Sequence, residues 1–97
     1  MSQDDTAIRA YQWTVSGRVQ GVGFRWFVLR AAKRSGVTGW VQNMWDGRVE
    51  VMGQGTVSSL HEFERELQNG PQLSIVEKVE KLEKTAEMGL FKSFEIK

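Results

Sequence analysis

The hydrophobic pattern changes its period early in the chain, and this change is the strongest constraint on the fold. Residues 11–16 alternate between apolar and polar side chains, which predicts a half-buried strand. A glycine-punctuated loop follows at residues 17–23. From residue 24 to about residue 35 the apolar side chains keep helical spacing, and Gly36 is suited to end the helix. The chain therefore begins with a strand, a short loop and a helix.

The middle of the chain predicts a hairpin and a second helix. Residues 38–44 and 48–52 have the composition of strands. Asp46-Gly47 lies between them and is typical of a tight hairpin turn, which needs positive φ. Thr56 can cap the helix that follows, with Ser59 as a weaker alternative, and Gly70-Pro71 marks its end.

Residues 76–84 are ambiguous, because their apolar residues repeat every three positions among Glu and Lys. This spacing alone favours a helix. The order of the other elements favours a strand, because strand, helix, hairpin and helix need one more strand to complete a βαββαβ sandwich. We therefore predict a strand here, and a short closing strand at residues 94–96.

Composition excludes several kinds of chemistry. The 97 residues contain no cysteine, so thiol nucleophiles, disulfides and thiolate metal sites are excluded. A net charge of +1 provides no long-range attraction to nucleic acid or to an anionic membrane. His61, the only histidine, lies beside an apolar helical stripe, and we interpret it as a surface or boundary residue without a chemical role.

Length and composition also predict the domain organisation. No linker or low-complexity tract interrupts the chain, so we expect one domain at residues 7–97 after a flexible tail at residues 1–6. The tail is polar and acidic, unlike a signal peptide, and no apolar run approaches the about 20 residues of a membrane span. We expect a cytoplasmic monomer.

The loop that leads into the first helix has the residues of an anion site. Unpaired N–H groups and the positive end of the helix dipole stabilise a phosphate at a helix N-terminus. Gly21 and Gly23 allow the backbone to approach an anion closely, and the guanidinium of Arg25 can bind phosphate through two hydrogen bonds. Nucleotide-binding loops do not fit, because no Gly-Lys-Ser/Thr follows Gly23 and Trp26 stands where a dinucleotide fingerprint needs glycine. Taken alone, the glycines would favour an ordinary tight turn.

The run Val19-Gln20-Gly21-Val22-Gly23-Phe24-Arg25 resembles the signature of the acylphosphatase family. Gly39-Trp40-Val41-Gln42-Asn43 resembles the second signature, and residues 46–51 resemble the hairpin of the family. Gly70-Pro71 and residues 94–96 also fit, so the resemblance covers nearly the whole chain after the tail. The departures, at Met44-Trp45 and Ser74, involve no residue to which a role is assigned.

This resemblance implies an α+β, ferredoxin-like fold, with two helices on one face of an antiparallel sheet and a short C-terminal strand. It implies hydrolysis of an acyl phosphate to a carboxylate and inorganic phosphate, with no metal, no cofactor and no nucleic-acid or membrane partner. By motif, Arg25 is the phosphate-binding arginine and Asn43 the water-positioning asparagine. The phosphate-binding loop then consists of the backbone amides of Gln20, Gly21, Val22, Gly23 and Phe24.

Three other functions remain open from the residues. An RNA-binding module can share this topology, and Gly21-Val22-Gly23-Phe24 is similar to part of an RNA-binding signature, although in the first loop instead of the third strand. A regulatory domain would bind the same ligand without turnover. An acylphosphatase-like domain attached to a larger maturation enzyme is the third, and the length of the chain argues against it.

Overall fold

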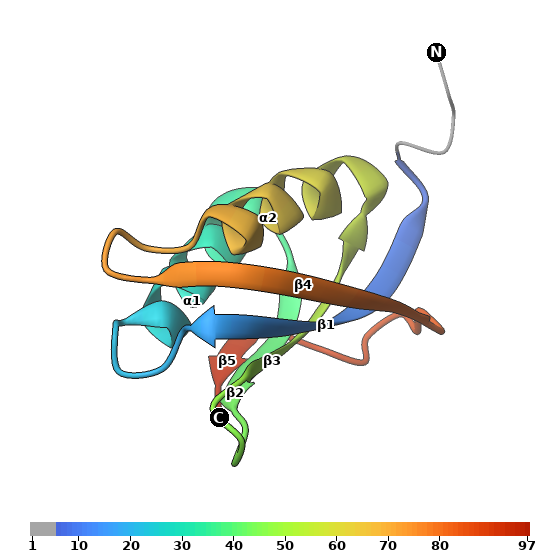
Figure 1. Ribbon diagram of the computed structural model, residues 1–97. Helices are drawn as coiled ribbons and strands as arrows, with labels where there is room; N and C mark the ends of the chain where they lie inside the picture. The colour runs from blue at the N-terminus through green and yellow to red at the C-terminus, as the bar shows by residue number, and fades with distance from the viewer. Residues whose placement is uncertain (1–5) are drawn as a thin grey trace.

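The computed structural model describes residues 6–97, so the predicted tail lies outside the described residues except for Thr6. Every predicted helix and strand is present in the order expected (Figure 1). The third strand continues beyond the predicted residue 52 directly into the second helix. The elements are β1 (Ile8–Arg18), α1 (Phe24–Ser35), β2 (Thr38–Asn43), β3 (Val49–Thr56), α2 (Val57–Asn69), β4 (Ile75–Lys84) and β5 (Phe94–Ile96).

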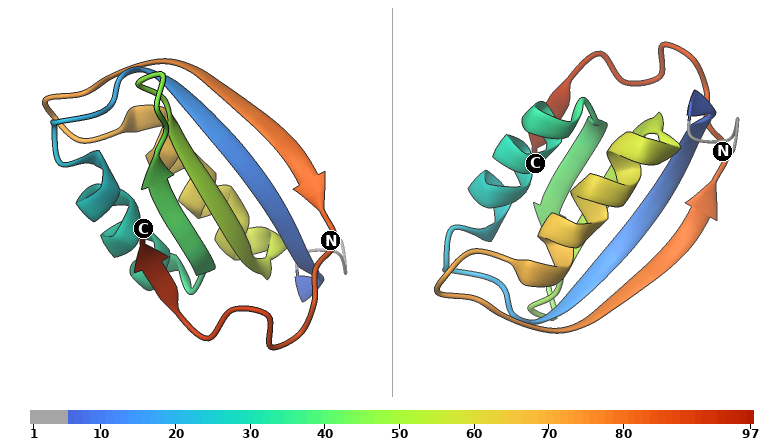
Figure 2. Two further views of the ribbon diagram at one scale, coloured as in Figure 1. Left: turned by 90° about the horizontal axis from the view of Figure 1, so that it is seen from below. Right: turned by 90° about the horizontal axis from the view of Figure 1, so that it is seen from above.

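The strands form one five-stranded sheet in the order β4-β1-β3-β2-β5. Both helices lie on the same face of this sheet (Figure 2). The first four strands pair antiparallel, as predicted, and the predicted short C-terminal strand β5 pairs parallel to β2, which makes the sheet mixed. The reason is the connection: the chain leaves β4 at one end of the sheet and passes along that end to the opposite edge. β5 therefore starts at the same end as β2.

The core lies between the sheet and the two helices. Trp13 of β1 contacts Phe63 of α2 edge to face with ring centroids 5.4 Å apart, and Phe63 contacts Phe94 of β5 at 5.8 Å. Each of these side chains is buried, and burying a large apolar side chain contributes about 1.5–3 kcal/mol. One aromatic cluster thus joins β1, α2 and β5.

A β-bulge in β4 reconciles part of the three-residue repeat in residues 76–84 with a strand. Val15 lies opposite Val79, but Gly17 lies opposite Val76, so β4 contains one extra residue, Glu77, at this point. The extra residue turns Val76 and Val79 toward the same face, where both pack against the core. Gly17 is required at the bulge, because a Cβ there would lie 2.1 Å from the carbonyl oxygen of Ile75.

The helix ends agree with the sequence predictions. Thr56 Oγ1 accepts a hydrogen bond from the Ser59 N–H at 3.1 Å and so caps α2. Gly36 ends α1 in the left-handed conformation. His61 is exposed on α2, as predicted.

Glu64 of α2 connects this helix to two strands. Its carboxylate accepts a hydrogen bond from Trp13 Nε1 at 3.0 Å and pairs with Lys81 Nζ of β4 at 2.9 Å. Partial burial would raise the pKa of Glu64, but the hydrogen bonds from Lys81 and Trp13 outweigh this effect and lower the pKa below its ordinary value.

We predict that Glu64→Gln lowers the free energy of unfolding at pH 7. A carboxylate whose pKa is lowered in the folded state stabilises the protein at pH values above its unfolded-state pKa. This contribution is lost as the pH falls through the folded-state pKa. The difference between wild type and variant should therefore shrink below about pH 4.5. Urea unfolding from pH 7 to pH 3 measures it, with Glu62→Gln on the exposed side of α2 as the control. A difference that does not change with pH would contradict the assignment.

Candidate active site

A hollow of about 110 Å³ lies where the end of β1, the start of α1 and the end of β2 meet. The short loop between β1 and α1 forms one side of it. This loop contacts the hairpin between β2 and β3 through the side chain of Gln20. Larger hollows exist elsewhere, including one of about 330 Å³ between α1 and α2. The residues around the small hollow distinguish it: Val19, Gly21, Gly23, Phe24, Arg25, Trp26 and Asn43.

The backbone of the loop supplies donors to this hollow. Gly21 and Gly23 have φ of 72° and 77°, and no atom lies within 4 Å of the position that a Cβ would take at either residue. Within residues 6–97, the N–H groups of residues 20–24 have no protein acceptor. The described first turn of α1 also contains no acidic residue and no capping side chain. The positive end of the helix dipole is therefore not balanced by any of these groups.

Arg25 lies in the first turn of α1 and is half-buried. Its Nη1 donates to the backbone oxygen of Lys97 at 3.1 Å, while the N–H of Lys97 donates to the Val41 oxygen at 2.8 Å. This is the guanidinium's only hydrogen bond to the described residues, so most of its five N–H donors have no protein acceptor. Sequence reasoning missed Lys97, since no local pattern reports a contact across 72 positions.

Asn43 is the last residue of β2, and its side chain is exposed. Its backbone lies opposite Val49 of β3, and within the described chain its side-chain amide has no hydrogen-bond partner. The strand alternation places Asn43 on the same face as the buried Val41, which is the face that packs on the helices. The amide of Asn43 thus borders the same hollow as Arg25.

The structure brings five of the seven predicted site residues to this hollow, namely Gly21, Gly23, Phe24, Arg25 and Asn43. Val22 packs against the hydrophobic core instead. The side chain of Gln20 turns away from the hollow toward the hairpin. Val19 and the exposed Trp26 also line the hollow, although neither was among the predicted site residues.

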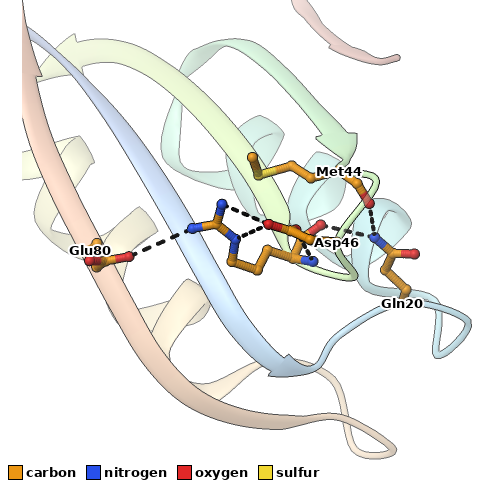
Figure 3. A network of polar contacts seen from close by, with 5 residues as sticks. Gln20, Met44, Asp46 and Glu80 are labelled. Carbon is orange, nitrogen blue, oxygen red and sulfur yellow. Dashed lines mark hydrogen bonds and ion pairs between the residues drawn. The ribbon is translucent and has the colours of Figure 1, made fainter.

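Two charged groups of the nearby hairpin, Asp46 and Arg48, are paired with each other. Asp46 in the hairpin turn accepts hydrogen bonds from the Arg48 N–H at 3.1 Å and from its Nε at 2.8 Å (Figure 3). These hydrogen bonds lower the pKa of Asp46, so the carboxylate is charged at neutral pH.

In residues 6–97 no three histidine, aspartate or glutamate side chains are grouped so that they could hold a metal ion. Neither α1 nor α2 has the length and hydropathy needed to cross a membrane.

Known proteins provide an independent comparison. The sequence profile of the acylphosphatase family matches residues 11–96. An acylphosphatase from Koribacter versatilis is 51% identical over 85 residues, which cover 88% of this chain and 76% of that protein.

Two solved structures extend this comparison. The structure of an acylphosphatase from Coxiella burnetii matches with a TM-score of 0.87 and 33% identity, covering all of both chains. Full-length HypF in a phosphate- and nucleotide-bound form matches with a TM-score of 0.78 and 30% identity, covering 92% of this chain but 12% of that one. The same architecture thus occurs in a chain of this size and as a small part of a larger protein. Because the family profile covers nearly the whole described fold and half of the aligned residues are shared with a curated relative, the chain belongs to the acylphosphatase family of enzymes.

Proposed function

We propose that this chain hydrolyses acyl phosphates by in-line attack of water on a phosphate held at the hollow beside α1. Arg25 and the N–H groups of residues 20–24 bind the phosphate oxygens, and Asn43 positions the attacking water. One observation supports this proposal most strongly: a guanidinium, a set of unpaired backbone donors and an unpaired side-chain amide border one small hollow. Backbone donors and a planar cation suit the equatorial oxygens of a transferring phosphoryl group.

The chemistry of an acyl phosphate suits this small set of groups. Its leaving group is a carboxylate, which is a weak base at neutral pH, so its departure needs no general acid. The protein has to position the water and stabilise the phosphoryl charge. The carbonyl oxygen of the Asn43 side chain can accept a hydrogen bond from the water and direct its lone pair at phosphorus.

No carboxylate or imidazole lines the hollow among the described residues, so we assign the proton of the water to the substrate itself. The bond between the water oxygen and phosphorus forms as the bond between phosphorus and the acyl oxygen breaks. One proton passes to a phosphate oxygen. The products are a carboxylate and inorganic phosphate.

RNA binding is less well supported than phosphate hydrolysis. The sheet face that such modules use lies opposite the helices, and here Glu50 of β3 lies on it and accepts hydrogen bonds from Gln12 and Gln42 on the neighbouring strands. A carboxylate at this position repels the phosphate backbone, whereas RNA-binding sheets of this topology present aromatic side chains for stacking.

We expect the protein to release inorganic phosphate from benzoyl phosphate at an unchanged rate after treatment with a chelator, because the proposed chemistry uses no metal. p-Nitrophenyl phosphate should not be hydrolysed, since its aryloxide leaving group is a stronger base than a carboxylate. If the protein binds phosphate but hydrolyses neither compound, it is a regulatory domain and not an enzyme. Loss of activity with the chelator would contradict the metal-free mechanism.

Arg25→Ala should lower kcat with benzoyl phosphate by at least roughly 10²- to 10³-fold, because it removes a charged transition-state donor. Inhibition by inorganic phosphate should weaken as well. Arg25→Lys keeps the charge but not the planar fork, and should recover only part of the activity. Steady-state kinetics of both variants test this, and near-wild-type turnover in Arg25→Ala would show that Arg25 does not bind the phosphate.

Asn43→Ala should lower kcat but leave inhibition by inorganic phosphate largely intact, because Asn43 is proposed to hold the water and not the phosphate. Asn69→Ala, at the exposed end of α2, is the matched control and should behave as wild type. Measuring kcat and the inhibition constant of phosphate separates the two roles. Loss of phosphate inhibition in Asn43→Ala would place this residue among the phosphate-binding groups instead.

A further inference from the structure

The side chain of Gln20 joins the loop of the site to the hairpin between β2 and β3. Although Gln20 lies in the loop, its Nε2 donates to the backbone oxygen of Met44 at 2.8 Å and to that of Arg48 at 2.9 Å (Figure 3). Both distances are ordinary for N–H···O hydrogen bonds, and both bonds are partly buried. One side-chain amide thus uses its two N–H groups to bind two points of another segment.

The hairpin turn that Gln20 contacts is closed by its own hydrogen bonds. The Met44 N–H donates to the Arg48 oxygen at 2.8 Å, and the Gly47 N–H donates to the Met44 oxygen at 3.2 Å. The Asp46 carboxylate pairs with the Arg48 guanidinium at 2.8 Å, and that guanidinium lies 4.0 Å from Glu80 of β4. Gln20 therefore attaches the loop to a turn that is already ordered.

The two acceptors of Gln20 adjoin the proposed water-positioning residue. Met44 directly follows Asn43, and Arg48 directly precedes Val49, which lies opposite Asn43 in the β2–β3 ladder. Gln20 is also next to Gly21 in the loop. These two hydrogen bonds therefore link the loop directly to the segment that carries Asn43.

We propose that Gln20 is a positioning residue that sets the distance between the phosphate-binding loop and Asn43. This inference rests on the proposed function, because it assigns Gln20 an effect on the alignment of water and phosphate. A glutamine suits this position because it provides two N–H donors on one atom, whereas a glutamate would place a carboxylate against two carbonyl oxygens. Its role is distinct from that of its backbone N–H, which every side-chain variant keeps.

The same geometry predicts that loss of the Gln20 side chain affects alignment more than folding. The Met44 oxygen keeps its hydrogen bond from Gly47, and the Arg48 oxygen keeps its bond from Met44. Neither carbonyl is then left without a donor, so the large cost of an unsatisfied buried group does not arise. The hairpin stays closed, but its attachment to the loop is lost.

The test is a double-mutant cycle between Gln20→Met and Asn43→Ala. Methionine has similar length and no donor, so we expect kcat with benzoyl phosphate to fall about tenfold, since small misplacements of reacting groups are costly. KM and the inhibition constant of phosphate should change less than about twofold, because the loop amides remain in place. In the Asn43→Ala background, Gln20→Met should have no further effect on kcat, because its effect acts through Asn43.

Gln68→Met, on the exposed side of α2, is the matched control and should keep wild-type kinetics. Gln20→Asn, which is too short to reach both carbonyls, serves as a second variant, and urea unfolding checks that each protein is folded. An unchanged kcat in folded Gln20→Met would overturn the inference, as would an equal loss in both backgrounds or unfolding of both Gln20 variants. A wild type without turnover would overturn the proposed function as well, so the two failures are distinguishable.

Discussion

The unpaired N–H groups at the start of α1 are the constraint on which the rest of the site depends. A helix N-terminus has donors that its own turns cannot satisfy, and here the described first turn adds neither a capping side chain nor an acidic residue. Gly21 and Gly23 keep the space in front of these donors open. The local structure is thus suited to an anion, and the surrounding elements determine which other groups can reach it.

Packing brings the other groups to this point. β1 and β2 both pair antiparallel with β3, so these two strands run in the same direction and both end near the start of α1. Asn43 at the end of β2 therefore faces the loop that follows β1. The guanidinium of Arg25 is held by a hydrogen bond to the backbone oxygen of Lys97, which follows β5. The proposed division of roles follows from this arrangement, with phosphate on the α1 side and water on the β2 side.

The order of elements could be read from the sequence, but some features of the sheet could not. The alternation in β1, the helical spacing in α1 and the Asp46-Gly47 turn are local signals, and each predicted the right element. The strand at residues 76–84 could be predicted only from the order of the other elements, because the spacing of its own residues favoured a helix. Only the bulge at Glu77 explains how Val76 and Val79 share one face. The parallel pairing of β5 depends on the path of a connection, which leaves no pattern in residues 94–96.

The sequence by itself determined the elements, their order and the residue types of the candidate site. These features depend on hydrophobic periodicity, turn residues and sequence motifs, which are local properties of the chain. Only the tertiary structure decided which of those residues meet. It placed the side chains of Gln20 and Val22 away from the hollow. It also joined Arg25 to Lys97 across 72 positions, and Gln20 to the hairpin across 24 and 28 positions. Such contacts depend on strand register and helix packing, which are properties of the folded chain and not of any one segment.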